Sequence, residues 1–455
     1  MPRFKFQQTF VAACSALLVL SSCQTLVPTQ TANRGLNPTA RLKIQARRGR
    51  LHCPPGALNC NPQDMSLPDE DQFILPPEYS PTQAVIVSDK LMEYPGSMQL
   101  LQALIQSDSD IWMLSKDQNL FQNSQRLLQI SVSPFFPMGQ SMYQLPIATD
   151  SIWSRDYGPI STFPDAEYQG PKLDYKLMNS YYYPDRFQDD RVPASLSRVL
   201  NSPIGPISQR RVFTSQLNLA LEGGNLMCND SICFVSDKVI ERNLGQTTPN
   251  GQTWTSVAEI QAEFASQFQQ PVHFVSALPG EGTGHIDMWA KFINQKTLLI
   301  GQISEQSVAL ADPIHRDEIK ALQAFLDIQA SGVDGDGAPV SDSLYQQAKQ
   351  QQADLQVVRI PMPLPMLNDA EFSVFRSYTN ALIVNQKALI PQYRNMPDGS
   401  QYPDSSLLNQ YEQAVQKAYQ AAGYEVKWIP SDQWIAMGGG VHCVTMQIPK
   451  TPTAM

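Results

Sequence analysis

An internal repeat constrains the fold of this 455-residue sequence more than any other feature. Three times, an amphipathic helical pattern precedes a short apolar strand that ends near a proline. The helical patterns cover 255–270, 342–354 and 404–422, and the strands that follow cover 272–275, 355–360 and 424–429. Two predicted hairpins, 292–296 and 383–387, both turn at Asn-Gln-Lys. A recurring β-β-α-β unit predicts an α/β fold in which units bury their apolar faces against neighbours in a closed radial array.

The charge balance excludes one class of partner. The formal net charge is −9, and no basic stripe in the repeat region could neutralise phosphates, so we expect no nucleic-acid partner. No stretch reaches the ~18 apolar residues of a transmembrane helix. Any attachment to a membrane would therefore need a different device.

The N-terminus supplies such a device. Arg3 and Lys5 precede an apolar run over 10–20, which is the pattern of a signal peptide. The run ends in Leu-Ser-Ser-Cys at Cys23, which resembles a bacterial lipobox. We predict a signal peptide over 1–22, a lipid-anchored Cys23 and a place in the bacterial cell envelope, at the outer membrane or cell surface. An ordinary secretory signal with a chance cysteine is the alternative.

The segment after Cys23 differs in composition from the rest. Residues 23–80 are rich in Pro, Thr, Gln and Asn, so we interpret them as a tether and N-terminal arm before a folded domain over 81–450. A basic cluster over 41–50 within this segment would either contact anionic lipid headgroups or form part of a solvated linker.

The cysteines isolate one thiol. Beyond the signal peptide and Cys23, five remain: Cys53, Cys60, Cys228, Cys233 and Cys443. The first two flank a Pro-Pro-Gly turn and the next two a hairpin-like turn, so both pairs are candidate disulfides. The last cysteine is then either buried and inert or chemically employed. None of the five histidines has ligand spacing from a cysteine pair, so we predict no metal site.

Four short motifs rich in glycine or aromatic residues stand at predicted strand ends. They cover 153–159, 221–225, 284–289 and 438–445. Glycine at such corners permits a positive φ and a close approach of a ligand to the backbone. We therefore expect these four corners to build the functional site.

The motifs combine a thiol with acids. Cys443 is the candidate nucleophile and His285 the candidate general acid and base. The carboxylates of Asp156, Glu222 and Asp287 would raise the pKa of the thiol unless a cation lies among them. A substrate guanidinium is a permanent, flat cation that binds carboxylates through paired hydrogen bonds. The combination favours guanidinium chemistry over peptide hydrolysis.

The remaining residues of these motifs have less decisive roles. His442 is the alternative base, but neighbours on a strand point to opposite faces, so His442 would face away from Cys443. Trp153 is expected to form the pocket wall or part of the core. Arg155 is expected to pair with an acid or to contact substrate.

At these residues the sequence resembles the Porphyromonas-type peptidyl-arginine deiminase and agmatine deiminase family of guanidine-modifying enzymes. Asp156 lies in a Trp-x-Arg-Asp-x-Gly-Pro motif, and Glu222 in Glu-Gly-Gly. His285 and Asp287 lie in Gly-His-x-Asp, and Cys443 in Gly-Gly-Gly-x-x-Cys. The four motifs occur in the family's order, and the resemblance covers about 80–450.

The resemblance implies a fold and a reaction. The fold would be a five-bladed, pentein-like ββαβ propeller with pseudo-fivefold repeats. The reaction would convert a guanidinium to a ureido group and ammonia through a covalent amidino intermediate on Cys443, without a cofactor. The residues implied or expected to bind substrate are Glu222, Asn380, Trp153 and Arg155.

The substrate remains open at this stage. Export favours arginine in peptides or proteins. Agmatine, giving N-carbamoylputrescine, is the main alternative, although a single Val441 stands where agmatine enzymes generally have Asn-Ile. An amidinotransferase, or a non-catalytic surface lipoprotein that uses the fold as a binding scaffold, are further alternatives.

Overall fold

The computed structural model describes residues 73–131, 142–164, 174–203, 211–368 and 373–451. All of them belong to one compact unit that spans residues 63–455. The predicted signal peptide, Cys23, the Cys53–Cys60 pair and the basic cluster lie outside the described residues.

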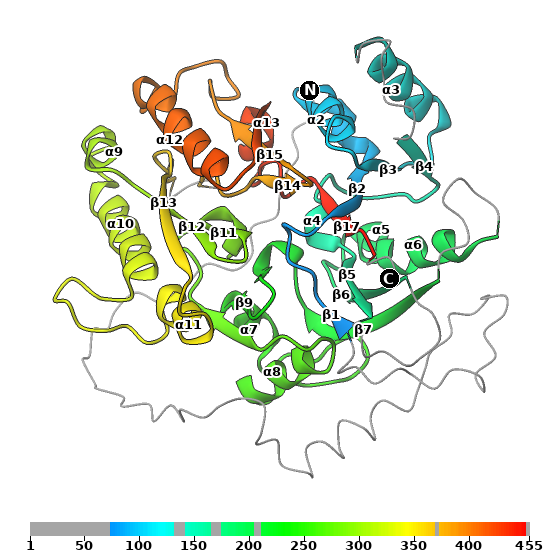
Figure 1. The fold of residues 1–455 in the computed structure, drawn as a ribbon, viewed down its shortest axis with the longest axis horizontal. Helices are drawn as coiled ribbons and strands as arrows, with labels where there is room; N and C mark the ends of the chain where they lie inside the picture. Colours follow the sequence, from blue (N-terminus) through cyan, green and yellow to red (C-terminus); the bar gives the residue numbers. More distant parts are fainter. Residues whose placement is uncertain (1–72, 132–141, 165–173, 204–210, 369–372, 452–455) are drawn as a thin grey trace. The chain divides into compact units, whose positions relative to one another are not determined.

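The strands of the described residues form five separate sheets of three or four strands (Figure 1). One four-stranded sheet contains β1 (Phe73–Ile74), β5 (Ile160–Pro164), β6 (Tyr175–Tyr181) and β7 (Val212–Ala220). The other contains β17 (Met446–Pro449), β2 (Thr82–Ser88), β3 (Asp110–Leu114) and β4 (Met142–Leu145). The three-stranded sheets are β10 (Val272–Val275), β9 (Cys233–Ser236) and β8 (Leu226–Cys228); β11 (Ala290–Asn294), β12 (Thr297–Gln302) and β13 (Gln356–Pro361); and β14 (Leu382–Val384), β15 (Lys387–Gln392) and β16 (Glu425–Pro430).

The repeated unit is confirmed in two of these sheets. The predicted hairpins are the antiparallel pairs β11–β12 and β14–β15. In each unit the chain then passes through helices and returns as a strand parallel to the second hairpin strand, β13 beside β12 and β16 beside β15. Parallel strands need a crossover connection, and helices form it in both units. Helices cover most of the predicted helical patterns 342–354 and 404–422.

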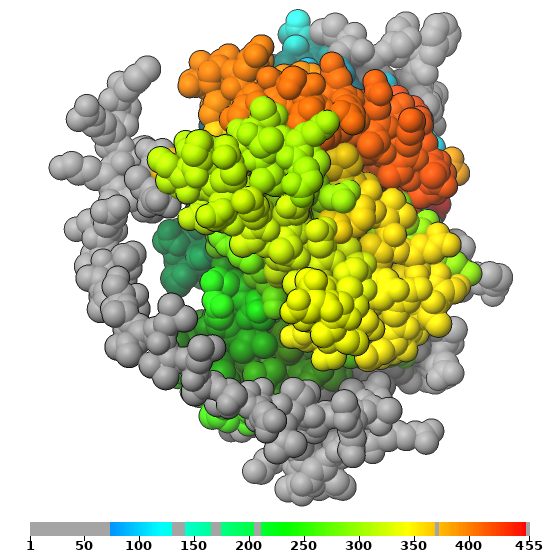
Figure 2. Space-filling model, turned by 90° about the vertical axis from the view of Figure 1, so that its left-hand side faces the viewer, coloured from blue at the N-terminus to red at the C-terminus, as the bar shows by residue number. Residues whose placement is uncertain are grey.

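The helices cover the sheets. They are α2 (Ser97–Ile105), α3 (Gln118–Ser131), α4 (Ser154–Tyr157), α5 (Phe187–Asp190), α6 (Val192–Asn201), α7 (Lys238–Asn243), α8 (Val257–Ala265), α9 (Glu305–Leu310), α10 (Arg316–Ser331), α11 (Leu344–Gln351), α12 (Leu408–Ala421) and α13 (Asp432–Ile435). Figure 2 shows α10, α11 and α12, in lime, yellow and orange, on one face of the unit. A stripe at helical spacing on α12 is buried, and it comprises Leu408, Tyr411, Val415 and Tyr419. None of the helices in the described ranges is long and apolar enough to cross a membrane.

The position of the central strands in the core explains why their sequences are continuous apolar runs. Leu298, Leu299 and Ile300 on β12 are all fully buried, although successive side chains point to opposite faces. A strand buried on both faces needs no polar alternation. The hairpin β8–β9 closes with a disulfide between Cys228 and Cys233, as the short spacing suggests.

The N-terminal arm joins the fold earlier than residue 81. Strand β1 pairs with β5, and the side chain of Gln270 bonds the backbone of Leu75 at both its N–H and its carbonyl. Residues 73–80, which composition alone groups with the tether, are therefore part of the folded unit. This position brings Glu78 to the site described below.

Candidate active site

The four sequence motifs meet in the structure. Arg155 on α4 donates its backbone N–H to the carbonyl of Cys443 at 3.0 Å. Asn225, at the end of the 3₁₀ turn η3 (Gly223–Asn225), donates to the carbonyl of Gly284 at 3.0 Å. That glycine leads into the turn η4 (Ile286–Met288). Hydrogen bonds to backbone carbonyls, one from a backbone N–H and one from the Asn225 side chain, thus fix the relative positions of corners that lie far apart in the sequence.

Cys443 lies at the centre of this arrangement. It is unpaired and only 2% exposed. The amide of Asn380 donates to its sulfur at 3.1 Å, and Oδ2 of Asp287 lies 4.0 Å from the sulfur. A side-chain nitrogen of His285, an oxygen of Asp287 and the sulfur lie within 4.8 Å of one another. The predicted nucleophile, base and acid are therefore in reach of one substrate atom.

His285 links this group to two more carboxylates. Its Nε2 lies 2.6 Å from Oε2 of Glu222, and its Nδ1 lies 3.8 Å from Oδ1 of Asp156. The other oxygen of Glu222 pairs with Arg242. Glu222 thus has a partner at each oxygen, His285 at one and Arg242 at the other. The sequence predicts a contact of Glu222 with substrate, and that role stays a prediction.

Two glycines are required by close approach. A Cβ at Gly224 would lie 2.4 Å from Nδ1 of His285, and a Cβ at Gly439 would lie 2.8 Å from the sulfur of Cys443 and 2.7 Å from the ring of Trp153. Any larger residue would displace the side chains of His285, Cys443 or Trp153. The glycine-rich motifs therefore make room for the site.

The electrostatics keep the thiol protonated in the free protein. Burial, and then the charge of Asp287, raise the pKa of Cys443 to about 12. Burial alone would lower the pKa of His285, but the carboxylates of Asp156 and Glu222 outweigh it and raise that pKa well above its ordinary value. Burial raises the pKa of Asp156 to about 8, although His285 opposes this. Despite burial, His285 and Arg242 lower the pKa of Glu222 to about 2.

Two carboxylate oxygens have no hydrogen-bond partner among the described residues. They are Oδ1 of Asp156 and Oδ1 of Asp287, both fully buried atoms. Buried polar atoms are almost always hydrogen-bonded, and carboxylates only accept. A flat cation with several N–H donors would satisfy both atoms.

The same groups have the spacing of a metal site. The triads His285, Asp287, Cys443 and Asp156, Glu222, His285 each place ligand atoms within 4.8 Å of one another. A metal-binding histidine must be neutral at its ligating nitrogen, so a metal ion there would have to displace the proton that the carboxylates of Asp156 and Glu222 favour on His285.

The premise that 442–443 lie on a strand is wrong, because residues 441–444 form a turn. Both ring nitrogens of His442 nevertheless contact acids. Its Nδ1 lies 2.5 Å from Oδ2 of Asp287, and its Nε2 lies 2.5 Å from Oε1 of Glu78. Sequence reasoning missed Glu78 because it was grouped with the tether. Its only signal was its place just before the start of the predicted folded domain at residue 81.

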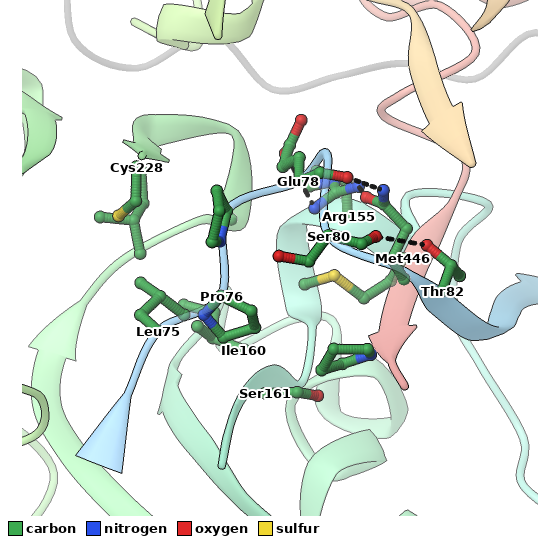
Figure 3. A pocket seen from close by; sticks show the side chains of 15 residues that line it. Leu75, Pro76, Glu78, Ser80, Thr82, Arg155, Ile160, Ser161, Cys228 and Met446 are labelled. Carbon is green, nitrogen blue, oxygen red and sulfur yellow. Dashed lines mark hydrogen bonds and ion pairs between the residues drawn. The ribbon is translucent and has the colours of Figure 1, made fainter. Parts of the chain in front are cut away.

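Arg155 pairs with an acid, which was one of its two expected roles. Its Nη1 lies 3.3 Å from Oε1 of Glu78, and its Nη2 donates to Gln447 at 2.7 Å (Figure 3). Trp153 is half-buried, and its ring borders the position of Gly439 beside the thiol. These residues thus form the wall of the site.

Comparison with solved structures defines the class. The agmatine deiminase of Enterococcus faecalis superposes with a TM-score of 0.57 at 17% identity, covering 85% of this chain and 98% of that one. The agmatine deiminase of Campylobacter jejuni gives 0.53 at 13% identity, covering 84% and 96%. The chain therefore has the pentein-type α/β fold of these enzymes.

The sequence comparisons define the family. The model of the Porphyromonas-type peptidyl-arginine deiminase family matches residues 79–449, so the chain belongs to that family. An agmatine deiminase of Pseudomonas aeruginosa is 22% identical over 317 residues, covering 67% of this chain and 76% of that protein.

The close approach at Gly224 can be tested directly. Gly224→Ala should push the His285 ring away from Glu222, because the added carbon would lie 2.4 Å from the ring. We expect the His285 ring signals in ¹⁵N NMR to shift and the melting temperature to fall. Gly335→Ala is the matched control, since a Cβ there meets nothing within 4 Å. Unchanged His285 signals in Gly224→Ala would contradict the described packing.

Proposed function

We propose that this protein hydrolyses the guanidinium group of arginine in peptides or proteins to a ureido group and ammonia. The observation that carries the proposal is a pair of buried carboxylate oxygens without a hydrogen-bond partner in the described part of the chain, Oδ1 of Asp156 and Oδ1 of Asp287, in a site where the other oxygen of Asp287 lies 4.0 Å from the sulfur of Cys443. A guanidinium held by both Oδ1 atoms would bring its central carbon to this thiol. Membership of the deiminase family supports the same reaction.

The substrate itself would activate the nucleophile. The free thiol has a pKa of about 12, because it is buried next to a carboxylate. A guanidinium bound by Asp156 and Asp287 places a positive charge beside the sulfur, which favours the thiolate. The displaced proton leaves to solvent, so the thiolate forms only when substrate is present.

The chemical steps then follow from the geometry. The sulfur lone pair forms a bond to the guanidinium carbon, and the C=N electron pair moves onto nitrogen. His285, which is protonated, gives its proton to the departing nitrogen, and ammonia leaves as the C–N bond breaks. The resulting amidino thioether is attacked by water, which gives a proton to His285. Collapse of this adduct breaks the C–S bond, its hydroxyl proton leaves to solvent as the C=O bond forms, and the ureido product is released with the thiolate restored.

Replacing the sulfur tests this mechanism. Cys443→Ser should lower the release of ammonia and ureido product by about 10³-fold or more, because an alcohol is a far weaker nucleophile at neutral pH. The folded structure should persist, since the two side chains are nearly isosteric. Ammonia and ureido assays, with melting temperature as the control for folding, decide the point. Full turnover by the variant would remove the thiol from the reaction.

Two half-buried arginines favour a substrate without a second cation. Arg242 pairs with Glu222, and Arg186 lies close enough to Asp156 for each to shift the pKa of the other. Agmatine carries an ammonium at the end opposite its guanidinium, which these cations would repel. An arginine residue in a peptide is flanked by neutral amides. Agmatine remains the second candidate because several relatives are agmatine deiminases.

The choice of substrate can be tested at Arg186. In Arg186→Gln, kcat/KM for agmatine should rise about fivefold relative to kcat/KM for an arginine peptide, since roughly 1 kcal/mol of charge repulsion is removed. Arg191→Gln is the matched control, because Arg191 is exposed and stacks on Phe187 at 3.5 Å. An unchanged ratio of the two values in Arg186→Gln would argue against this role.

We also propose that the chain is exported and anchored by a lipid on Cys23, in the cell envelope. The support is the sequence: Arg3 and Lys5, the apolar run over 10–20 and the lipobox pattern. An exported enzyme meets peptides more readily than a cytosolic agmatine pool, which agrees with the preferred substrate.

The anchor has a simple test. In bacterial cells fed a labelled fatty acid, the full chain should carry the label and fractionate with membranes, whereas Cys23→Ala should do neither. Cys14→Ala is the control, since Cys14 lies within the predicted signal peptide. Labelled, membrane-bound Cys23→Ala would exclude this anchor.

For the fold, we propose that the five sheets are the blades of a closed propeller with pseudo-fivefold symmetry. The support is the shared ββαβ order of the units around β12 and β15. In experimental coordinates, unit-to-unit rotations far from a fifth of a turn would contradict closure.

A further inference from the structure

His442 adjoins the nucleophile in sequence but bridges two acids in space. Its ring, 1% exposed, lies between Oδ2 of Asp287 and Oε1 of Glu78, with 2.5 Å to each. Asp287 comes from η4, whereas Glu78 comes from the N-terminal arm. The arm therefore reaches a substrate-binding carboxylate through a single imidazole ring.

The hydrogen bonds of this bridge run from one ring to two acids. Burial opposes the ionisation of Asp287 and Glu78, but the contacts with His442, followed by those with nearby cations, lower the pKa of both acids. Ionised carboxylates can only accept hydrogen bonds. A His442 ring that carries a proton on each nitrogen would donate to both acids. The ring therefore ties the two carboxylates together.

Glu78 is itself held firmly. One oxygen pairs with Lys291 on β11, whose side chain is 2% exposed, and the other lies 3.3 Å from Nη1 of Arg155. Figure 3 shows Glu78 and Arg155 together at one end of the small pocket beside the arm. Two buried cations thus fix the position of this carboxylate, and through it the ring of His442.

The bridge leaves one atom of Asp287 for substrate. Oδ2 is taken by His442, whereas the buried Oδ1 has no hydrogen-bond partner among the described residues. A carboxylate held at one oxygen can rotate only at the cost of a charge-assisted hydrogen bond. The other oxygen therefore keeps a fixed direction.

We propose that Glu78 and His442 are positioning residues that hold Asp287 ionised, with Oδ1 directed at the substrate guanidinium. The inference rests on the proposed deimination, which it deepens. It gives the N-terminal arm a part in the active site that the catalytic motifs alone do not supply. Neither residue touches the reacting atoms, so their effect passes entirely through Asp287.

The first readout is spectroscopic and uses the unmodified protein. In ¹⁵N-histidine-labelled wild type near neutral pH, both ring nitrogens of His442 should carry protons, with the signal assigned by its loss in His442→Gln. In Glu78→Gln, one nitrogen should lose its proton, because an amide can donate to it. A neutral His442 ring in the wild type would overturn the charged bridge.

The second readout is kinetic. Glu78→Gln should lower kcat/KM about 10-fold or more, the usual effect of losing a supporting partner of a functional ligand. The loss should be equal for an arginine peptide and for agmatine, because both present the same guanidinium to Asp287. Glu318→Gln is the matched control and should leave activity unchanged. Oε2 of the exposed Glu318 also pairs with a histidine, at 3.2 Å from Nδ1 of His315.

A double variant separates positioning from folding. Glu78→Gln leaves Lys291 buried without its partner, which lowers stability. Glu78→Gln/Lys291→Met removes that unpaired charge, so stability should recover while kcat/KM stays low. Recovered activity in the double variant, or unchanged kcat/KM in Glu78→Gln, would overturn the positioning role. Inactivity of the wild type on every guanidine substrate would instead remove the proposed function. The ¹⁵N measurement of His442 does not depend on activity, so it would still support or overturn the charged bridge.

Discussion

A buried carboxylate oxygen without a hydrogen-bond partner is costly, and this site maintains two of them next to a thiol. The cost is tolerated because hydrogen bonds hold the backbone at both acids: Arg155, next to Asp156 on α4, donates its N–H to the carbonyl of Cys443, and the carbonyl of Asp287 accepts from the hydroxyl of Thr379. The site thus discriminates by charge before any chemistry occurs. A neutral guest would leave both oxygens unsatisfied, whereas a planar cation satisfies them and changes the state of the sulfur at once.

The architecture serves this requirement. Mixed sheets of three or four strands place a turn at one end of each unit, and the core behind them is apolar on both faces of the central strands. Fixed cations then compensate two other carboxylates. Arg242 compensates Glu222, and Lys291 compensates Glu78. The two carboxylate oxygens of the site that lack a hydrogen bond among the described residues belong to Asp156 and Asp287.

Much of this could be predicted from the sequence, for identifiable reasons. Hairpins at Asn-Gln-Lys and strands such as 424–429 are local patterns, and local patterns survive in the fold. A cysteine, a histidine and several acids that all lie in short glycine-containing motifs form an unusual combination, so Cys443 and His285 could be singled out from the sequence. The bridge to Glu78 could not be predicted, because 364 residues separate it from His442 and no periodicity connects them. The contact of Glu222 with Arg242 could not be predicted either, because Arg242 lies twenty residues away on α7.

The start of the folded region has a practical consequence. The family match begins at residue 79, one position after Glu78. Anyone who trims the chain to its recognisable homology would therefore remove a side chain that contacts His442, Lys291 and Arg155, together with the β1 strand before it. The start of the family match shows where sequence similarity becomes detectable. In this protein that position lies within the contacts around the site, not at the edge of the folded unit.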